Sequence, residues 1–182
     1  MEITLIRHGK PASTDSPKVN ALEYTQWIRR YNLSPIAEDS RPNKLRPELA
    51  SYYVMSSDIK RAIHSAEIYT GRQPDHISSL YKEMELPRYK LPFRLKPLTW
   101  VYLCRALWMI GKRGPFESYR HAKERAVLAA EQLVTVAQEN GQVVLFGHGY
   151  LNIHIRKILV RKGWLLNGKS SDYWGVTTLT AP

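Results

Sequence analysis

The chain has 182 residues, of which 43% are hydrophobic and 24% charged, a balance typical of one globular domain and not of a disordered chain. Its 27 Lys and Arg against 16 Asp and Glu give a net charge of +11, which favours anionic partners: a phosphorylated small molecule, a nucleic acid or an anionic lipid surface. A single cysteine, Cys104, excludes an intramolecular disulfide and a cysteine-based zinc site.

We expect no signal peptide, because the N-terminus has an acid at position 2 and only a short apolar run. The most apolar segment, 98–111, contains Arg105 and is shorter than the roughly 20 residues that a membrane-spanning helix needs. We therefore expect no transmembrane helix. The lack of disulfides suits a cytoplasmic location.

The predicted elements are strands that alternate with helices. In chain order they are a strand at 3–6, helices at 22–31 and 58–69 on either side of a strand at 52–55, helices at 100–109 and 118–139, a strand at 142–146, a helix from 149 to about 162 and a strand at 176–179. This order predicts a three-layer α/β/α sandwich with a mainly parallel central sheet. We expect a single domain over 1–182, with a basic, aromatic insertion at about 82–117.

Two helices carry clear boundary signals. Ser57 is the expected N-cap of the 58–69 helix, and Gly71 lies just past its end. The 118–139 helix is expected to stop at Asn140-Gly141. Its predicted apolar stripe consists of Val127, Ala130, Leu133, Val134 and Ala137.

Two histidines follow predicted strands directly, His8 after the first and His148 after the strand at 142–146. Ligand sites in open α/β sheets form beyond the carboxyl ends of strands, so both imidazoles are expected on one rim. Gly147 and Gly149 leave room for a ligand near the backbone, and the helix that follows would direct its first N–H groups at an anion. The alternative is that each histidine only caps its strand.

Two arginines are expected at the same rim. Arg7 precedes His8, and Arg61 lies in the first turn of the helix after the second strand. Guanidinium and imidazole groups together suit a tetrahedral dianion, of which a phosphoryl group is the best fit. A leaving alkoxide needs a proton, and Glu83 and Glu85 are the only acids between Asp75 and Glu117. The alternative for the arginines is that they are solvated surface residues. The alternative for the two acids is that they only compensate the charge of neighbouring bases.

Four segments resemble the motifs of the histidine phosphatase (phosphoglycerate mutase-like) superfamily, in the family's order. Leu5-Ile6-Arg7-His8-Gly9 resembles its R-H-G signature, and Ser56 to Ala62 resembles its S-S-x-x-x-R-A motif. The segment 80–86 resembles the part that carries the family's acid, and Phe146-Gly147-His148-Gly149 resembles its late His-Gly motif. The resemblance implies a phosphoglycerate mutase-like fold and a phosphatase without metal or cofactor.

The resemblance also implies a role for each matched residue. His8 is the nucleophile, and Arg7, Arg61, His148 and Gly149 bind the phosphoryl group. Glu83, preferred to Glu85, is the general acid and then the base that activates water.

Several positions depart from the family's pattern and leave the substrate open. They are Lys10-Pro11 after R-H-G, Thr14 in place of a phosphate-binding Asn, His64-Ser65 after R-A, Pro87 after the acid segment and Gly147 before the second histidine. These departures motivate one alternative, a non-catalytic basic protein that binds phosphorylated ligands. A phosphoglycerate-type mutase is a weaker alternative, because no motif supports a second substrate site.

Segment 82–113 carries eight bases and only two acids, with aromatic residues interleaved. By resemblance it forms a lid that favours a substrate with a second anionic group or an aromatic body. The same composition suits nucleic acid or an anionic membrane, although neither is favoured over a solvated basic face whose aromatic residues pack in the core.

Overall fold

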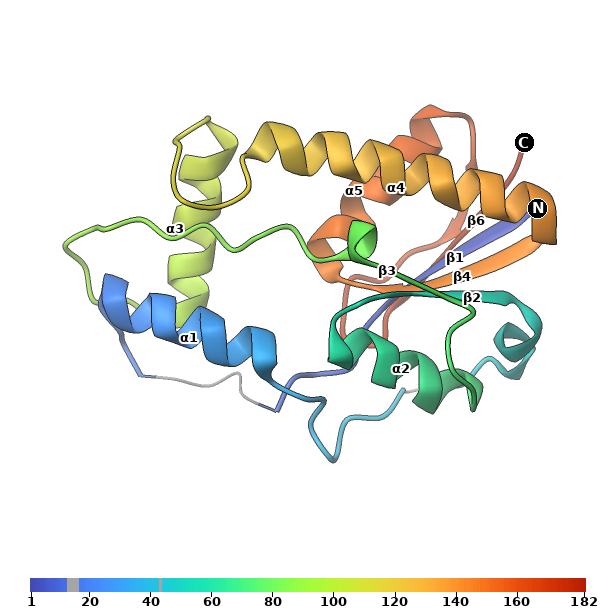
Figure 1. Cartoon of the computed structure of the whole chain (residues 1–182), viewed down its shortest axis with the longest axis horizontal. Coiled ribbons are helices and arrows are strands. Elements are labelled where there is room, and N and C mark those ends of the chain that lie inside the picture. The colour runs from blue at the N-terminus through green and yellow to red at the C-terminus, as the bar shows by residue number, and fades with distance from the viewer. Residues whose placement is uncertain (13–16, 43) are drawn as a thin grey trace.

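A computed structural model describes residues 1–12, 17–42 and 44–182 (Figure 1). In this part of the chain one sheet has the strand order β3-β2-β4-β1-β6-β5. The strands are β1 (Glu2–Arg7), β2 (Tyr53–Ser57), β3 (His76–Ser78), β4 (Gln142–Gly147), β5 (Leu165–Gly168) and β6 (Val176–Thr180). β3, β2, β4 and β1 pair in parallel, whereas β6 is antiparallel to both β1 and β5. The prediction of a mainly parallel sheet is confirmed.

Helices cover both faces of the sheet. They are α1 (Ala21–Leu33), α2 (Lys60–Thr70), α3 (Pro97–Met109), α4 (Tyr119–Asn140) and α5 (Gly149–Arg161), with 3-10 turns at Pro47–Ser51 and Ser79–Tyr81. Figure 1 shows α4 and α5 on one face and α2 on the other, which gives the three predicted layers. α1 and α3 lie together beside the sheet, at the left edge of the view.

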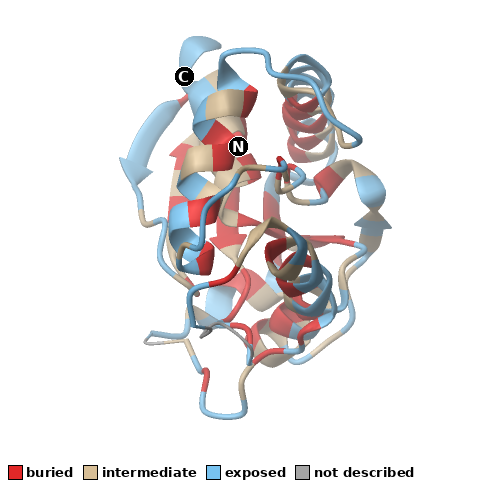
Figure 2. Ribbon diagram, turned by 90° about the vertical axis from the view of Figure 1, so that its left-hand side faces the viewer, coloured by how far each residue is buried: buried red, intermediate tan, exposed pale blue. Residues whose placement is uncertain are grey.

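The alternation of side chains along the strands explains the two cores. In β4, Val143 and Leu145 pack in the cluster under α4 and α5, while Val144 and Phe146 pack in the cluster that includes α2. Strands with both faces covered carry mostly apolar residues, and the interior of this sheet is largely buried (Figure 2). The buried face of α4 is mostly alanine, and Val127, expected in its apolar stripe, is instead 38% exposed.

A third cluster joins α1 to α3. Tyr24 stacks on Trp100 with ring centroids 5.4 Å apart, and the Trp100 indole N–H donates to the Val19 carbonyl at 2.9 Å. Trp27 and Cys104 are buried in the same cluster. Part of the aromatic content of the basic segment is therefore core, as one of the alternatives expected.

The boundary predictions succeed where glycine ends a helix and fail at Ser57. Gly71 and Gly141 end α2 and α4 with φ of 71° and 77°. Ser57 is the last residue of β2, and Ile59 is the N-cap of α2, without a side-chain cap. The short strands β3 and β5 were not predicted. No described helix is both long and apolar enough to cross a bilayer.

Candidate active site

The carboxyl ends of β1 and β4 place His8 and His148 on the same rim, as predicted. The two strands pair in parallel with Arg7 opposite Gly147, so the residue that follows each strand falls beside the other. Both imidazoles are buried, and their ring centroids lie 5.0 Å apart in an edge-on arrangement. The expectation that the two histidines converge is met.

Hydrogen bonds orient the His8 ring for one chemical role. Nδ1 lies 2.7 Å from the Gly9 carbonyl oxygen, and Nε2 lies 3.1 Å from Arg61 Nε, whose N–H donates to it. A carbonyl can only accept, so Nδ1 carries the proton and Nε2 keeps its lone pair. Ser65 supports this loop, because its hydroxyl accepts the Gly9 N–H at 3.0 Å. Nε2 is thus the unprotonated nitrogen of the ring, and its lone pair accepts the Arg61 N–H.

Arg61 reaches this rim from the first turn of α2, as predicted, and is almost fully buried. Its Nη1 donates to the carbonyls of Tyr31 and Asn32, at 3.3 and 3.0 Å. These carbonyls lie in the last turn of α1, where the helix dipole is negative and stabilises a cation. The end of α1 therefore holds the guanidinium against His8.

Both histidines are neutral near pH 7. Burial, reinforced by the charge of Arg61, lowers the pKa of His8 from 6.5 to about 3. Burial also lowers the pKa of His148 well below its ordinary value, with further contributions from His8 and Arg61. The His148 ring is fixed through Nε2, which lies 3.0 Å from Ser57 Oγ. Its buried Nδ1 has no hydrogen-bond partner among the described residues.

The buried neutral state of His8 predicts a pH-dependent stability. The unfolded chain protonates His8 below pH 6.5 and the folded chain only near pH 3, so the free energy of unfolding should fall as the pH drops through this range. At pH 5 the burial of neutral His8 lowers the free energy of unfolding by about 2 kcal/mol relative to its value well above pH 6.5. Urea unfolding of wild type and His8→Asn at pH 8 and pH 5 measures the effect. The variant should lose about 2 kcal/mol less than wild type, and identical losses would contradict the assignment.

Arg7 approaches the site from the end of β1. Its Cζ lies 3.9 Å from the centre of the Tyr173 ring, and its Nη1 donates to the Ser171 carbonyl at 2.8 Å. Its Nε is buried and has no hydrogen-bond partner in the described part of the chain. Arg7 Nε and His148 Nδ1 are thus two unengaged polar atoms beside His8.

Gly149 is the first residue of α5, and because it has no side chain the Arg7 side chain can pack against it. A Cβ at this position would lie 3.0 Å from Arg7 Nε and 3.2 Å from its Cδ. We expect Gly149→Ala to displace the guanidinium and lower kcat/KM for p-nitrophenyl phosphate roughly 10- to 100-fold. Gly168→Ala is the matched control, since its Cβ meets nothing within 4 Å. Equal kcat/KM in both variants and wild type would show that Arg7 takes no part in the reaction.

Glu83, from the segment after the turn at Ser79–Tyr81, contacts the start of α5, the helix whose N-cap is His148. Its carboxylate accepts the backbone N–H of Tyr150 at 3.1 Å and of Leu151 at 2.9 Å. Two of the N–H groups that were expected to face a ligand anion therefore bind a side-chain carboxylate of the protein itself. Glu85 is exposed and accepts the Glu117 N–H instead, at 2.7 Å. Of the two candidate acids, only Glu83 contacts the start of α5.

Three residues that contact the site were not predicted from the sequence to belong to it. Ser57 binds His148, Ser65 binds the loop after His8, and Tyr173 lies against Arg7 with its ring centroid 5.9 Å from that of His8. Tyr173 comes from the loop before β6, where Trp174 has a φ of 60°, unusual for a residue with a Cβ. Thr14 lies outside the described residues.

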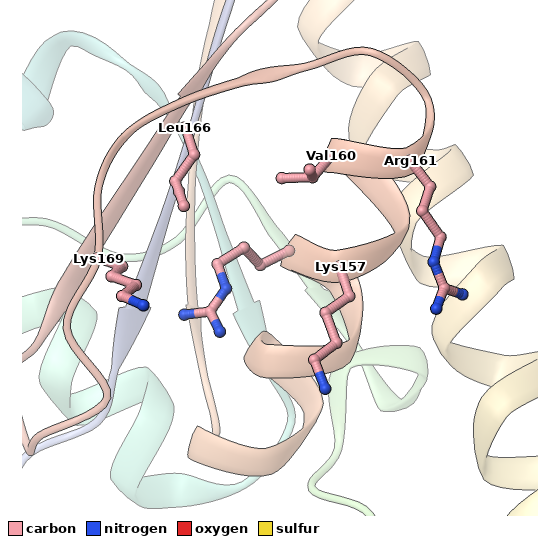
Figure 3. A pocket seen from close by; sticks show the side chains of 6 residues that line it. Lys157, Val160, Arg161, Leu166 and Lys169 are labelled. Carbon is pink, nitrogen blue, oxygen red and sulfur yellow. The ribbon is translucent and has the colours of Figure 1, made fainter.

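No cluster of three or more His, Cys, Asp or Glu side chains in the described ranges could hold a metal ion. A hollow of about 390 Å³ lies away from the histidines, between α5 and β5 (Figure 3). Its lining is cationic and aliphatic: Arg156, Lys157, Val160, Arg161, Leu166 and Lys169. None of these residues belongs to the site described above.

Neither a known family profile nor a curated protein matches the sequence. Solved structures do match. Phosphoserine phosphatase from Entamoeba histolytica, in complex with 3-phosphoglyceric acid, superposes with a TM-score of 0.60 at 16% identity over 99% of this chain and 95% of that one. A mycobacterial glucosyl-3-phosphoglycerate phosphatase superposes with a TM-score of 0.54 at 17% identity, over 88% of this chain and 79% of that one.

The ecdysone phosphate phosphatase of Bombyx mori, in complex with tungstate, gives a TM-score of 0.54 at 12% identity over 100% of this chain and 92% of that chain. These neighbours are members of the histidine phosphatase superfamily. The chain thus has the phosphoglycerate mutase-like fold that its motifs predict.

Proposed function

We propose that this chain is a phosphomonoesterase that works without a metal, through a phosphohistidine on His8. The observation that carries the proposal is the His8 ring itself: Nδ1 is held by a carbonyl, and Nε2 keeps its lone pair beside the Arg61 guanidinium. Such a ring is a nucleophile at neutral pH, and an adjacent cation favours an anionic electrophile. The structural neighbours are phosphatases, which supports the same class of reaction.

In the first step, His8 Nε2 forms a bond to phosphorus while the ester P–O bond breaks. The hydrogen bond that the Arg61 Nε–H donates to His8 Nε2 shifts to a phosphoryl oxygen, and Arg7 Nε and His148 Nδ1 supply polar contacts to the others. These groups balance the charge that spreads over the equatorial oxygens. Glu83 donates a proton to the leaving oxygen, so the alcohol departs neutral.

In the second step, water attacks the phosphorus and the N–P bond breaks. Glu83 takes the proton of that water, which returns the carboxyl group to its first state and releases inorganic phosphate. The backbone N–H groups of Tyr150 and Leu151 orient the Glu83 carboxylate for both transfers. The substrate enters as a phosphate monoester and leaves as an alcohol and phosphate.

The basic segment borders this site. Arg105 of α3 lies over the Tyr150 ring, with its Cζ 3.9 Å from the ring centre, and its Nη2 lies 3.4 Å from the carbonyl of Met84, the residue after Glu83. These contacts favour the lid role that the resemblance implies for 82–117.

The proposal is tested by hydrolysis of p-nitrophenyl phosphate after treatment with EDTA, followed by acid-free quenching and mass spectrometry. We expect full activity without metal and a phosphoryl adduct on the peptide that contains His8. Activity lost with EDTA and restored by a divalent cation would contradict the metal-free mechanism. Vanadate binding without turnover of any phosphomonoester would favour the binding protein instead.

A further inference from the structure

The outer face of α3 is an exposed apolar stripe. Leu98, Tyr102 and Met109 are separated by four and seven residues, which places them on one side of the helix. Their exposures are 62%, 73% and 46%, and Ile110, just past the helix, is 81% exposed. Trp100 and Trp108 on the opposite side are buried. The stripe is therefore not part of the core.

Basic residues lie at both ends of this stripe. Arg94 and Lys96 precede α3, and Lys112 and Arg113 follow it, all four exposed. No Asp or Glu occurs between 86 and 116. Of these bases, Arg94 forms an ion pair with Glu23 of α1, and Lys112 lies over the Tyr89 ring. The apolar stripe is therefore flanked at both ends by positive charge, of which only Arg94 is paired with an acid among the described residues.

We propose that this α3 face docks on the surface of an anionic lipid bilayer. Aliphatic side chains enter the acyl boundary and the cations meet the headgroups, while Tyr102 suits the interface between them. A second copy of the chain would bring like charges together. Nucleic acid is disfavoured because the stripe is mostly aliphatic, whereas base stacking needs exposed aromatic rings. The proposal does not depend on the proposed phosphatase activity.

The hollow between α5 and β5 provides a control surface. It has four cations, but its lining is concave and its aliphatic residues lie within it (Figure 3). Its Val160 and Leu166 are 44% and 41% exposed, whereas Leu98, Tyr102 and Ile110 of the stripe protrude further, at 62%, 73% and 81%. Binding by charge alone would involve both surfaces, whereas binding as proposed involves only α3.

Co-sedimentation of the full chain with vesicles tests the proposal. We expect binding to phosphatidylcholine vesicles that contain 30% phosphatidylserine, little binding to pure phosphatidylcholine, and release as salt is raised. Lys112→Gln with Arg113→Gln should weaken partitioning roughly 30-fold. Ile110→Ser with Tyr102→Ser should weaken it about tenfold or more, without a change of charge.

Two matched controls should leave vesicle binding unchanged. Leu128→Ser removes an exposed apolar residue from α4, and Lys157→Gln with Arg161→Gln removes two cations from the hollow. No binding to the anionic vesicles, or equal loss in the α3 and control variants, would overturn the proposal. So would α3 variants that keep vesicle binding and lose binding to a labelled single-stranded oligonucleotide. Circular dichroism confirms that each variant is folded.

Discussion

Replacement of His8 by alanine is expected to lower kcat for p-nitrophenyl phosphate by about 10³-fold or more. The variant loses His8 Nε2, the atom proposed to accept the phosphoryl group, whereas Arg7, Arg61 and His148 remain. It should therefore still bind vanadate or inorganic phosphate. Steady-state rates and vanadate titration, on the same preparations, separate the loss of the nucleophile from the loss of the binding site.

The matched control is His64→Ala. His64 lies on the same helix as Arg61 but is exposed, and it was assigned no role from the sequence. This variant should retain full activity. Turnover retained in His8→Ala, with a melting temperature equal to that of wild type, would rule out His8 as the nucleophile.

Replacement of Glu83 by glutamine is expected to affect substrates unequally. For an alkyl phosphate such as glycerol 2-phosphate, kcat/KM should fall by about 10²- to 10⁴-fold, because the alkoxide leaves without a proton. For p-nitrophenyl phosphate the leaving group needs no proton, so kcat/KM should change little. The ratio kcat/KM reports only steps up to the first irreversible one, so loss of the base that activates water does not enter the comparison.

Glu85→Gln is the matched control, two residues away on the same segment. Its carboxylate binds the Glu117 N–H and not the start of α5, so both substrates should be hydrolysed at wild-type rates. Equal losses on both substrates in Glu83→Gln would exclude Glu83 as the general acid. A loss of activity on the alkyl phosphate in Glu85→Gln would instead assign the role of general acid to Glu85.

The parts of the site that follow strands directly could be predicted from the sequence. His8, Arg61 and His148 are located by local rules, since each lies within a few residues of the carboxyl end of a buried parallel strand. The choice of Glu83 came from the family resemblance, and its contact with the start of α5 agrees with that choice.

Contacts between distant segments were not predictable in the same way. Ser57 looked like a helix cap because serine before a helix usually is one, but its hydroxyl lies beside His148, 91 residues later. Tyr173 lies in a loop without periodicity, and its position depends on the antiparallel pairing of β6 with β1. The strands β3 and β5 have three and four residues, too few for a pattern.

The position of β1 between β4 and β6 has a consequence for how the protein is made. Both neighbours of this first strand come from residues 142–180, so β1 has no partner in the sheet while the ribosome synthesises the intervening chain. At ribosomal rates that interval lasts roughly 10 to 35 s. During it Ile3, Leu5 and Ile6, which are buried in the folded protein, lack both neighbouring strands, and an unpaired apolar strand of this kind favours aggregation. The end of β1 and the loop after it hydrogen-bond to Gly147 and Gly175, so this loop takes its final geometry only after β4 and the residues before β6 are in place.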